Sequence, residues 1–301
     1  MRKYEVDGMK SIKKRMAGRR DSLISFGIVI LAYIVIQIMI STGNISSSLK
    51  GQLVPICAYI VMAVSLNLTV GFLGELSLGH AGFMSVGAFT GIVVTTSLAQ
   101  AIPSAPLRLA IAMIIGGIFA AVAGVIVGVP VLRLKGDYLA IVTLAFGEII
   151  KNIINVLYIG MDGNGLHFSL LEQRFALEDG GKMIINGPMG VSGVTKISSF
   201  TSGIILILIT LFLILNLVHS RTGRAVMSVR DNRIAAESIG ISATRYRLLA
   251  FVISAAFAGM AGTLYAMNFS TVTANKFDFN TSILVLVFVL SLIHISEPTR
   301  H

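Results

Sequence analysis

Two apolar segments of this chain are joined by the basic stretch HSRTGRAVMSVRDNRIAAESIGISATRYR, which covers residues 219–247 and holds six arginines. The flanking segments, residues 200–218 and 248–268, are each about 20 residues long, the length at which an apolar helix crosses a lipid bilayer. A basic loop between two such segments is typical of a membrane protein whose loops protrude from the bilayer. We therefore interpret the rest of the chain as folded in lipid.

The composition agrees with a lipid environment. Hydrophobic residues make up 55% of the 301 residues and charged residues only 13%, whereas soluble domains hold about 25% charged residues. Further apolar segments complete the set of candidate spans, the last of which is short: 22–40, 53–70, 82–99, 109–132, 138–157, 200–218, 248–268 and 282–295. The sequence thus predicts an all-α, polytopic membrane helical bundle of about eight transmembrane helices.

The basic residues sort by loop, which argues against nucleic-acid binding despite the net charge of +10. Residues 1–21 hold eight Lys and Arg and residues 219–247 hold six Arg, while the long polar segment 158–199 balances acids with bases. Because basic loops stay cytoplasmic, we expect 1–21 to be a cytoplasmic N-terminus, 219–247 a cytoplasmic loop and 158–199 an external loop. Counting one span at a time gives the same sidedness.

Glycines interrupt the chain at residues 71–82, where an unbroken helix is expensive to maintain. We expect this segment to bend or break, and we interpret Glu75 and His80 within it as solvated at the membrane edge or, alternatively, as contacts for the substrate. Non-helical backbone at membrane depth survives where it is buried in protein or lines a watery cavity. The segment is therefore either a wall of a translocation pathway or an ordinary turn between two spans. The candidate pathway residues are Asn67, Glu75, Ser77, Gly79, His80 and Glu148.

Small residues at four-residue spacing predict close helix packing: Gly87 with Gly91, Gly124 with Gly128, Ala255 with Gly259 and Ala258 with Gly262. Inside the spans, Glu148 and Lys151 share one helical face, and each charge is costly in lipid. The simpler interpretation is an ion pair between them, and the alternative is a role in the pathway.

Catalytic motifs are absent from the sequence. It contains no H-E-x-x-H, no G-x-S-x-G and no phosphate-binding loop of the form G-x-x-x-x-G-K-[ST]. Its five histidines are scattered along the chain, and its one cysteine, Cys57, has no partner for a disulfide. We therefore predict neither a catalytic site, nor a metal site, nor a bound cofactor.

The basic loop has its own helix signals. Asp231 is predicted to cap a helix of about two turns from Asn232 to Ile239, which Gly240 ends in a left-handed conformation. Ile234, Ala235, Ser238 and Ile239 fall near one face of it. Such a helix suits the groove of a partner protein, or it lies on anionic lipid held by its arginines.

The run from Arg221 to Ile241 closely resembles the cytoplasmic coupling loop of branched-chain amino acid permeases of ABC importers, the LivM type (LivH/LivM family) in particular. Three further motifs agree: SLNLTVGFLGELSLGHAGF at 65–83, GDYLAIVTLAFG at 136–147 and GNGL at 163–166. The resemblance covers residues 55–270 and implies one importer permease domain at 22–290.

The resemblance also implies partners and roles. A second permease subunit, two ATP-binding cassette subunits and a periplasmic substrate-binding protein would join this chain in the bacterial inner membrane, with ATP and Mg²⁺ held by the cassettes. The implied ATPase-coupling residues are Arg230, Arg233, Ala235, Ala236, Glu237 and Gly240. The implied cargo is a branched-chain amino acid, and related permeases carry urea or short amides instead.

The end of the chain departs from the family pattern. Relatives continue into a glycine-rich segment and further helices, whereas residues 291–301 read SLIHISEPTRH, which we interpret as a non-native tail on a truncated gene. Two other function classes stay open beside the importer permease. One is an ion-coupled secondary transporter, and the other is an assembly subunit that carries nothing itself.

Overall fold

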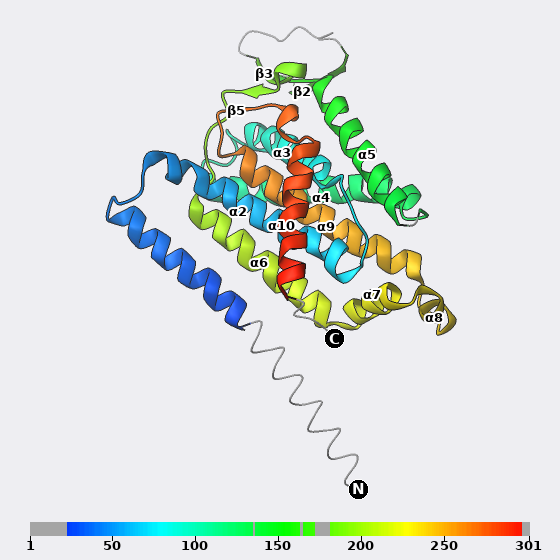
Figure 1. Ribbon diagram of the computed structural model, residues 1–301. Coiled ribbons are helices and arrows are strands. Elements are labelled where there is room, and N and C mark those ends of the chain that lie inside the picture. Colours follow the sequence, from blue (N-terminus) through cyan, green and yellow to red (C-terminus); the bar gives the residue numbers. More distant parts are fainter. Residues whose placement is uncertain (1–22, 135, 163–164, 172–180, 297–301) are drawn as a thin grey trace.

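The computed structural model describes residues 23–134, 136–162, 165–171 and 181–296. The basic N-terminus predicted at 1–21 lies outside the described residues, as do parts of the 158–199 segment and the last five residues of the chain. Within the described part, most of the chain is helical (Figure 1).

The helices, in chain order, are Leu23–Ser41, α2 (Ser47–Asn67), the π-helix η1 (Leu68–Phe72), α3 (His80–Ser97), α4 (Ala105–Val131), α5 (Asp137–Asn155), α6 (Phe200–His219), α7 (Arg221–Asp231), α8 (Arg233–Ser238), α9 (Ala243–Ala266) and α10 (Phe279–Ser296). Two single 3₁₀ turns, η2 (Gly187–Met189) and η3 (Ala274–Lys276), lie in the connections.

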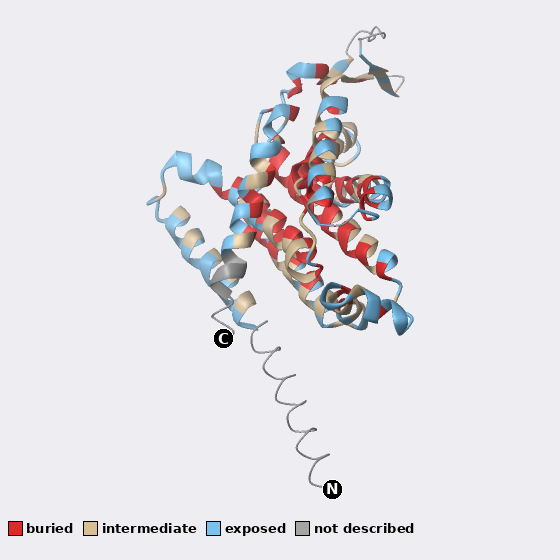
Figure 2. Ribbon diagram, turned by 45° about the vertical axis from the view of Figure 1, so that its right-hand side comes forward, coloured by how far each residue is buried: buried red, intermediate tan, exposed pale blue. Residues whose placement is uncertain are grey.

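The predicted membrane bundle is confirmed. Among the described residues, seven helices are long and apolar enough to cross a membrane. The expected span at 82–99 corresponds to α3, which is not one of these seven helices and contains His80 and many Gly, Ser and Thr residues. Neighbouring helices cover α3, so most of its residues are buried in protein (Figure 2).

The tightest packing joins α3, α4 and α9 around their small residues. Gly87 of α3 lies directly against Gly259 of α9, and Gly262 lies against the backbone of Met84, so a side chain at either glycine would overlap backbone. Thr263 adds a hydrogen bond from its Oγ1 to the carbonyl oxygen of Gly87 at 2.8 Å. The helix-packing role that the four-residue spacing predicted is confirmed for this trio.

Strands appear where the sequence predicted only a polar loop. β1 (Leu157–Asp162) pairs antiparallel with β2 (Gly165–Leu170) and with β3 (Lys182–Asn186), and β4 (Val191–Ser192) pairs with β5 (Thr271–Val272). These sheets lie at the end of the bundle opposite α7 and α8 (Figure 1). We call the two ends the sheet end and the α8 end.

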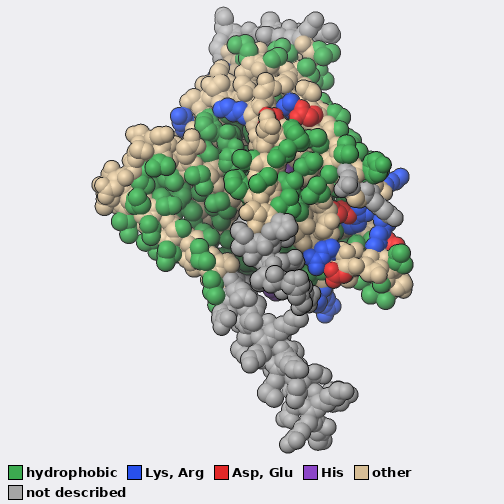
Figure 3. All heavy atoms as spheres, in the orientation of Figure 1, with side chains coloured by type: hydrophobic (Ala, Val, Ile, Leu, Met, Phe, Trp, Pro, Cys, Tyr) green, Lys and Arg blue, Asp and Glu red, His purple; other side chains and the backbone are tan. Residues whose placement is uncertain are grey.

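The surface has the pattern of a membrane protein. On the face shown in Figure 3, charged side chains gather near the top and toward the lower right, with mainly hydrophobic side chains between them. Most of the first described helix, Leu23–Ser41, is exposed, and it stands beside the bundle (Figures 1 and 2). The chain is therefore a multi-pass membrane protein.

The predicted break between the second and third spans is present but shorter than 71–82. The helix continues through η1, in which Leu73 N–H donates to the carbonyl oxygen of Leu68 at 3.2 Å, and α3 begins at His80. Residues 73–79 are non-helical, and Gly74 has a φ of +75°, which favours glycine. We refer to 73–79 as the break.

Candidate functional site

The basic loop folds into two short helices at the α8 end. The Ser220 hydroxyl caps α7 by accepting from the N–H of Gly223 at 3.2 Å. The side chain of Asn232 caps α8 by accepting from the N–H of Ala235 at 3.0 Å. The predicted cap at Asp231 is wrong by one residue, because α7 continues through Asp231 and leaves Asn232 as the extended residue between the helices.

The end of α8 follows the prediction. Gly240 has a φ of +87°, and the N–H of Ile241 donates to the carbonyl oxygen of Ala236 at 3.0 Å. This left-handed residue turns the chain sharply from α8 toward α9. A residue with a Cβ would be strained in that conformation, so the chain direction at this point depends on glycine.

The two faces of α8 differ in burial. Ala236 packs against Val229 of α7 and Ala243 of α9, and all three are buried. On the outer face Ile234 is 82% exposed and Ile239 is 73% exposed. Ala235 and Ser238 share that outer face and are exposed as well. The outer face of α8 is therefore a small apolar surface, and the opposite face packs on the bundle through Ala236.

Two charges border this apolar surface. Arg233 Nε donates to Glu237 Oε1 at 3.0 Å, across one turn of α8. Both side chains are exposed, so the pair adds little to stability and is available to a partner.

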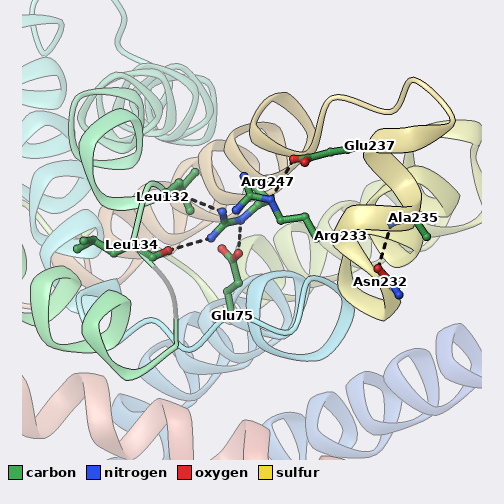
Figure 4. Close-up of polar contacts among 8 residues, drawn as sticks. All are labelled: Glu75, Leu132, Leu134, Asn232, Arg233, Ala235, Glu237 and Arg247. Atoms are coloured by element: carbon green, nitrogen blue, oxygen red, sulfur yellow. Dashed lines mark hydrogen bonds and ion pairs between the residues drawn. The ribbon is translucent and has the colours of Figure 1, made fainter.

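A second arrangement of charges lies near α8, at the N-terminal end of α9, which we call the foot of α9 (Figure 4). Arg247 forms an ion pair with Glu75 of the break. The same guanidinium donates to the carbonyl oxygen of Leu132 at 2.7 Å and to that of Leu134 at 3.4 Å, both in the α4–α5 turn. Arg247 is 4% exposed, and it joins three chain segments that are distant in sequence.

Arg230, near the end of α7, contacts the other side of the break. Its Nη1 donates to the carbonyl oxygen of Gly71 at 3.0 Å, and its Nε and Nη2 donate to Asp231 Oδ1. The stem of Arg230 lies over Gly74, where an added Cβ would come within 2.8 Å of the Arg230 Cγ. Arg230, which the resemblance of the basic loop predicts to be a coupling residue, therefore also contacts the helix break.

Three arginines and one acid surround a small cavity. Its volume is about 210 Å³, and it is lined by Leu73, Gly74, Glu75, Gly136, Val229, Arg230, Arg233 and Arg247. Burial raises the pKa of the Glu75 carboxyl, and the guanidiniums of Arg247 and Arg233 offset part of that rise. Glu75 is thus mostly enclosed, and the predicted solvation of this residue at the membrane edge is wrong.

His80 is likewise buried rather than solvated. It is 2% exposed, and its Nε2 lies 3.0 Å from the Oγ of Ser65 on α2. Ser254 of α9 donates to the carbonyl oxygen of Ser65 at 2.5 Å. Hydrogen bonding satisfies these polar groups inside the bundle, as buried polar groups require.

The other candidate pathway residues lie along the same segment. Asn67 is the last residue of α2 and is half-buried. Ser77 and Gly79 are buried, and Gly79 packs directly on the backbone of Thr143 in α5. Their role in translocation stays a prediction.

Glu148 lies apart from this cluster, on α5. It forms the predicted ion pair with Lys151, three residues further on. Its side chain is 36% exposed and that of Lys151 is 17% exposed. The ion-pair interpretation is confirmed, and the alternative pathway role stays a prediction.

The sequence does not single out the residues that connect the loop to the rest of the bundle. It shows Arg247 only as one of six arginines in the loop, and Thr143 and Ser282 only as polar residues of two apolar spans. Their one signal in the sequence is that a polar or charged group sits within or beside an apolar span, where it needs a partner.

Comparisons with known proteins agree with this picture. Residues 48–295 match the family model described as branched-chain amino acid transport system / permease component. The chain is 34% identical over 299 residues to the high-affinity branched-chain amino acid transport system permease protein LivM of Salmonella typhimurium, covering 95% of this chain and 67% of that protein. The LivM protein of Escherichia coli is 34% identical over 297 residues, with the same coverage.

More distant relatives also match. The probable branched-chain amino acid transport permease protein LivM of Methanocaldococcus jannaschii is 25% identical over 256 residues, covering 73% of this chain and 67% of that protein. No solved structure matches the chain significantly. The membrane bundle and these matches together place the chain in the family of branched-chain amino acid transport system permease components.

Proposed function

We propose that this permease component is the translocating subunit of an ATP-driven importer that carries branched-chain, hydrophobic amino acids across the bacterial cytoplasmic membrane. The α8 end faces the cytoplasm in this proposal, because the arginine-rich loop lies there. The sheet end faces the external side and receives the substrate. The N-terminus is cytoplasmic.

The proposed importer needs further subunits beside this chain. A second permease subunit completes the pathway, two ATP-binding cassette subunits bind at the α8 end, and a periplasmic substrate-binding protein delivers the amino acid at the sheet end. ATP and Mg²⁺ belong to the cassettes, since this chain has no phosphate-binding loop. The chain itself is no enzyme and holds no cofactor.

The outer face of α8 is the observation that supports the proposal most directly. Ile234 and Ile239 are large apolar residues that are more than 70% exposed. Arg233 and Glu237 border them, and Ala236 fixes the helix to the bundle from behind. An exposed amphipathic helix held at both ends fits a groove on a partner, which is how helices commonly dock.

A double substitution tests the proposal. Arg233→Ala with Glu237→Ala removes the charged border of α8 and leaves its buried Ala236 untouched. In the complete transporter reconstituted in proteoliposomes, we expect ATP hydrolysis without matching amino acid uptake, and normal membrane insertion. Uptake equal to that of the parent protein contradicts the proposed role of α8.

The cargo and the energy source have separate tests. Purification of the substrate-binding protein encoded beside this chain, followed by calorimetry with leucine, valine, urea and acetamide, identifies the cargo. Uptake by this chain alone, driven by an ion gradient, favours a secondary transporter instead. Co-purification of cassette subunits with the tagged chain favours the importer.

A further inference from the structure

Two arginines connect the α7–α9 segment to opposite sides of the helix break. We propose that Arg230 and Arg247 are positioning residues that pass a displacement of α8 directly to the break at 73–79, rather than through the length of α9. This inference rests on the proposed function, because it takes α8 as the place where the cassettes act.

The first connection is made on the near side of the break. Arg230 of α7 donates to the carbonyl oxygen of Gly71, within the π-helical turn Leu68–Phe72. A π-helical turn is rare in proteins and is frequently found at functional sites. The stem of Arg230 also lies against Gly74, so α7 cannot move toward the break without pushing on it.

The second connection is made within the break itself. Arg247 pairs with Glu75 and donates to the carbonyl oxygens of Leu132 and Leu134. Because Arg247 begins the second turn of α9, directly after α8, it moves with the foot of α9. A charge-assisted pair of this kind is shorter and stronger than a hydrogen bond between neutral groups.

The far side of the break is bonded to other helices. The N–H of Leu78 donates to Thr143 Oγ1 of α5 at 3.0 Å, and the N–H of Ala81 donates to Ser282 Oγ of α10 at 3.1 Å. His80 contacts Ser65 of α2. A movement of the break therefore reaches α2, α5 and α10 together, and α3 with them.

The space around the break permits such a movement. The cavity of about 210 Å³ lies between the break, α7 and the foot of α9. Gly74 is exposed and has a positive φ, and residues 73–76 lie in no regular helix, whereas Gly79 at the far end of the break packs on the backbone of Thr143. By contrast, α9 is packed against α3 and α4 through glycines that leave no room for sliding.

The experiment compares import with ATP hydrolysis in the reconstituted transporter. The double variant Glu75→Gln with Arg247→Met removes the ion pair. Both charges are removed together, because a single unpaired charge left buried would by itself destabilise the fold. We expect this double variant to insert, to assemble with the cassettes and to hydrolyse ATP, while amino acid import per ATP falls about tenfold or more. Import per ATP equal to that of the parent overturns the proposal.

Arg230→Ala provides an independent second variant, since its exposed side chain contributes little to folding. The same loss of import per ATP is expected. The matched controls are Arg245→Met on α9 and Arg221→Ala on α7, which remove exposed arginines from the same helices and leave coupling unchanged. A loss in the controls as large as in the variants also overturns the proposal.

A measurement without cassettes separates this inference from the proposed function. If the parent complex hydrolyses no ATP, the proposed function fails. Hydrogen exchange of the detergent-purified chain still tests whether Arg230 and Arg247 hold the break in place. In Arg230→Ala and in the double variant, amides at 68–79 are expected to exchange about tenfold faster, with those of α9 unchanged. Unchanged exchange at 68–79 overturns the inference.

Discussion

The α3–α4–α9 trio and the region around the helix break are held together by different kinds of contact. The trio packs glycine against backbone, with Gly87 on Gly259 and Gly262 on Met84. Around the break, guanidinium bonds connect Arg230 of α7 to Gly71, and Arg247 of α9 to Glu75 and Leu132, and both arginines line the cavity.

Backbone packing and side-chain bonds respond differently to a force. Packed backbones have a single arrangement, because any shift produces overlap. The side chains around the break meet at a cavity, which leaves space for a shift. We therefore expect the trio to be the rigid part of the molecule, and the α7–α8 loop and the break to move together.

The largest expected effect tests the rigidity of the trio. Gly262→Val places a branched side chain against the carbonyl group of Met84, and we expect a loss of more than about 3 kcal/mol of stability, so that little folded protein remains. Size-exclusion chromatography of the detergent-solubilised, fluorescently tagged chain measures this. The control is Gly51→Val on α2, where nothing lies within 4 Å of an added Cβ. A normal elution profile for Gly262→Val would contradict the claim that the backbone packing of the trio tolerates no added side chain.

A smaller loss is expected from the hydrogen bond within the trio. Thr263→Val keeps the shape of the side chain and removes the donor to the carbonyl oxygen of Gly87. Such bonds between membrane helices contribute about 0.6 kcal/mol on average, and up to about 1.7. The midpoint of unfolding in a denaturing detergent should therefore fall slightly. A fall as large as that of Gly262→Val would mean that bonding, and not close packing, holds the trio together.

The cap of α8 should affect the loop alone. Asn232→Ala removes the acceptor for the Ala235 N–H, which costs about 1 kcal/mol of local helix stability. Amides of α8 should exchange about fivefold faster, with the exchange of α9 unchanged. Asp231→Ala is the control, because Asp231 lies at the end of α7 and does not cap α8. If the amides of α8 exchange faster in Asp231→Ala and not in Asn232→Ala, then Asp231, and not Asn232, caps α8.

The smallest effect on folding is expected at the outer face of α8. Ile234→Ser alters a residue that is 82% exposed, so stability should change by less than about 0.5 kcal/mol. Co-purification of cassette subunits should nevertheless decrease if α8 is their docking surface. Val226→Ser, at a buried residue of α7, is the contrasting variant, with lower stability expected. Unchanged co-purification with Ile234→Ser would argue for docking elsewhere.

Local signals in the sequence predicted α8 and its end, but not the longer helix α7 before it. The helix at 232–239 was placed within one residue, because an Asx cap and a left-handed glycine are local devices. The interruption of the helix, which the structure places after Phe72, was predicted from the density of glycines. The pair of Glu148 with Lys151 needed only helical spacing.

Features that depend on distant residues were missed. The burial of His80 requires Ser65 to face it from another helix, and the pairing of Glu75 requires the foot of α9. The sheet of β1, β2 and β3 joins segments on both sides of residues 172–180, and no alternation in the sequence had indicated its strands.

The sequence by itself determined that this protein folds in a lipid bilayer, and it determined the approximate positions of the membrane-spanning helices and of α8. Hydrophobicity, caps and glycines act over a few residues, so they can be read along the chain. Only the tertiary structure decided that Arg230 and Arg247 meet the break and that Gly262 meets Met84. Those contacts depend on how helices cross and rotate against one another, which the period of a single helix does not specify.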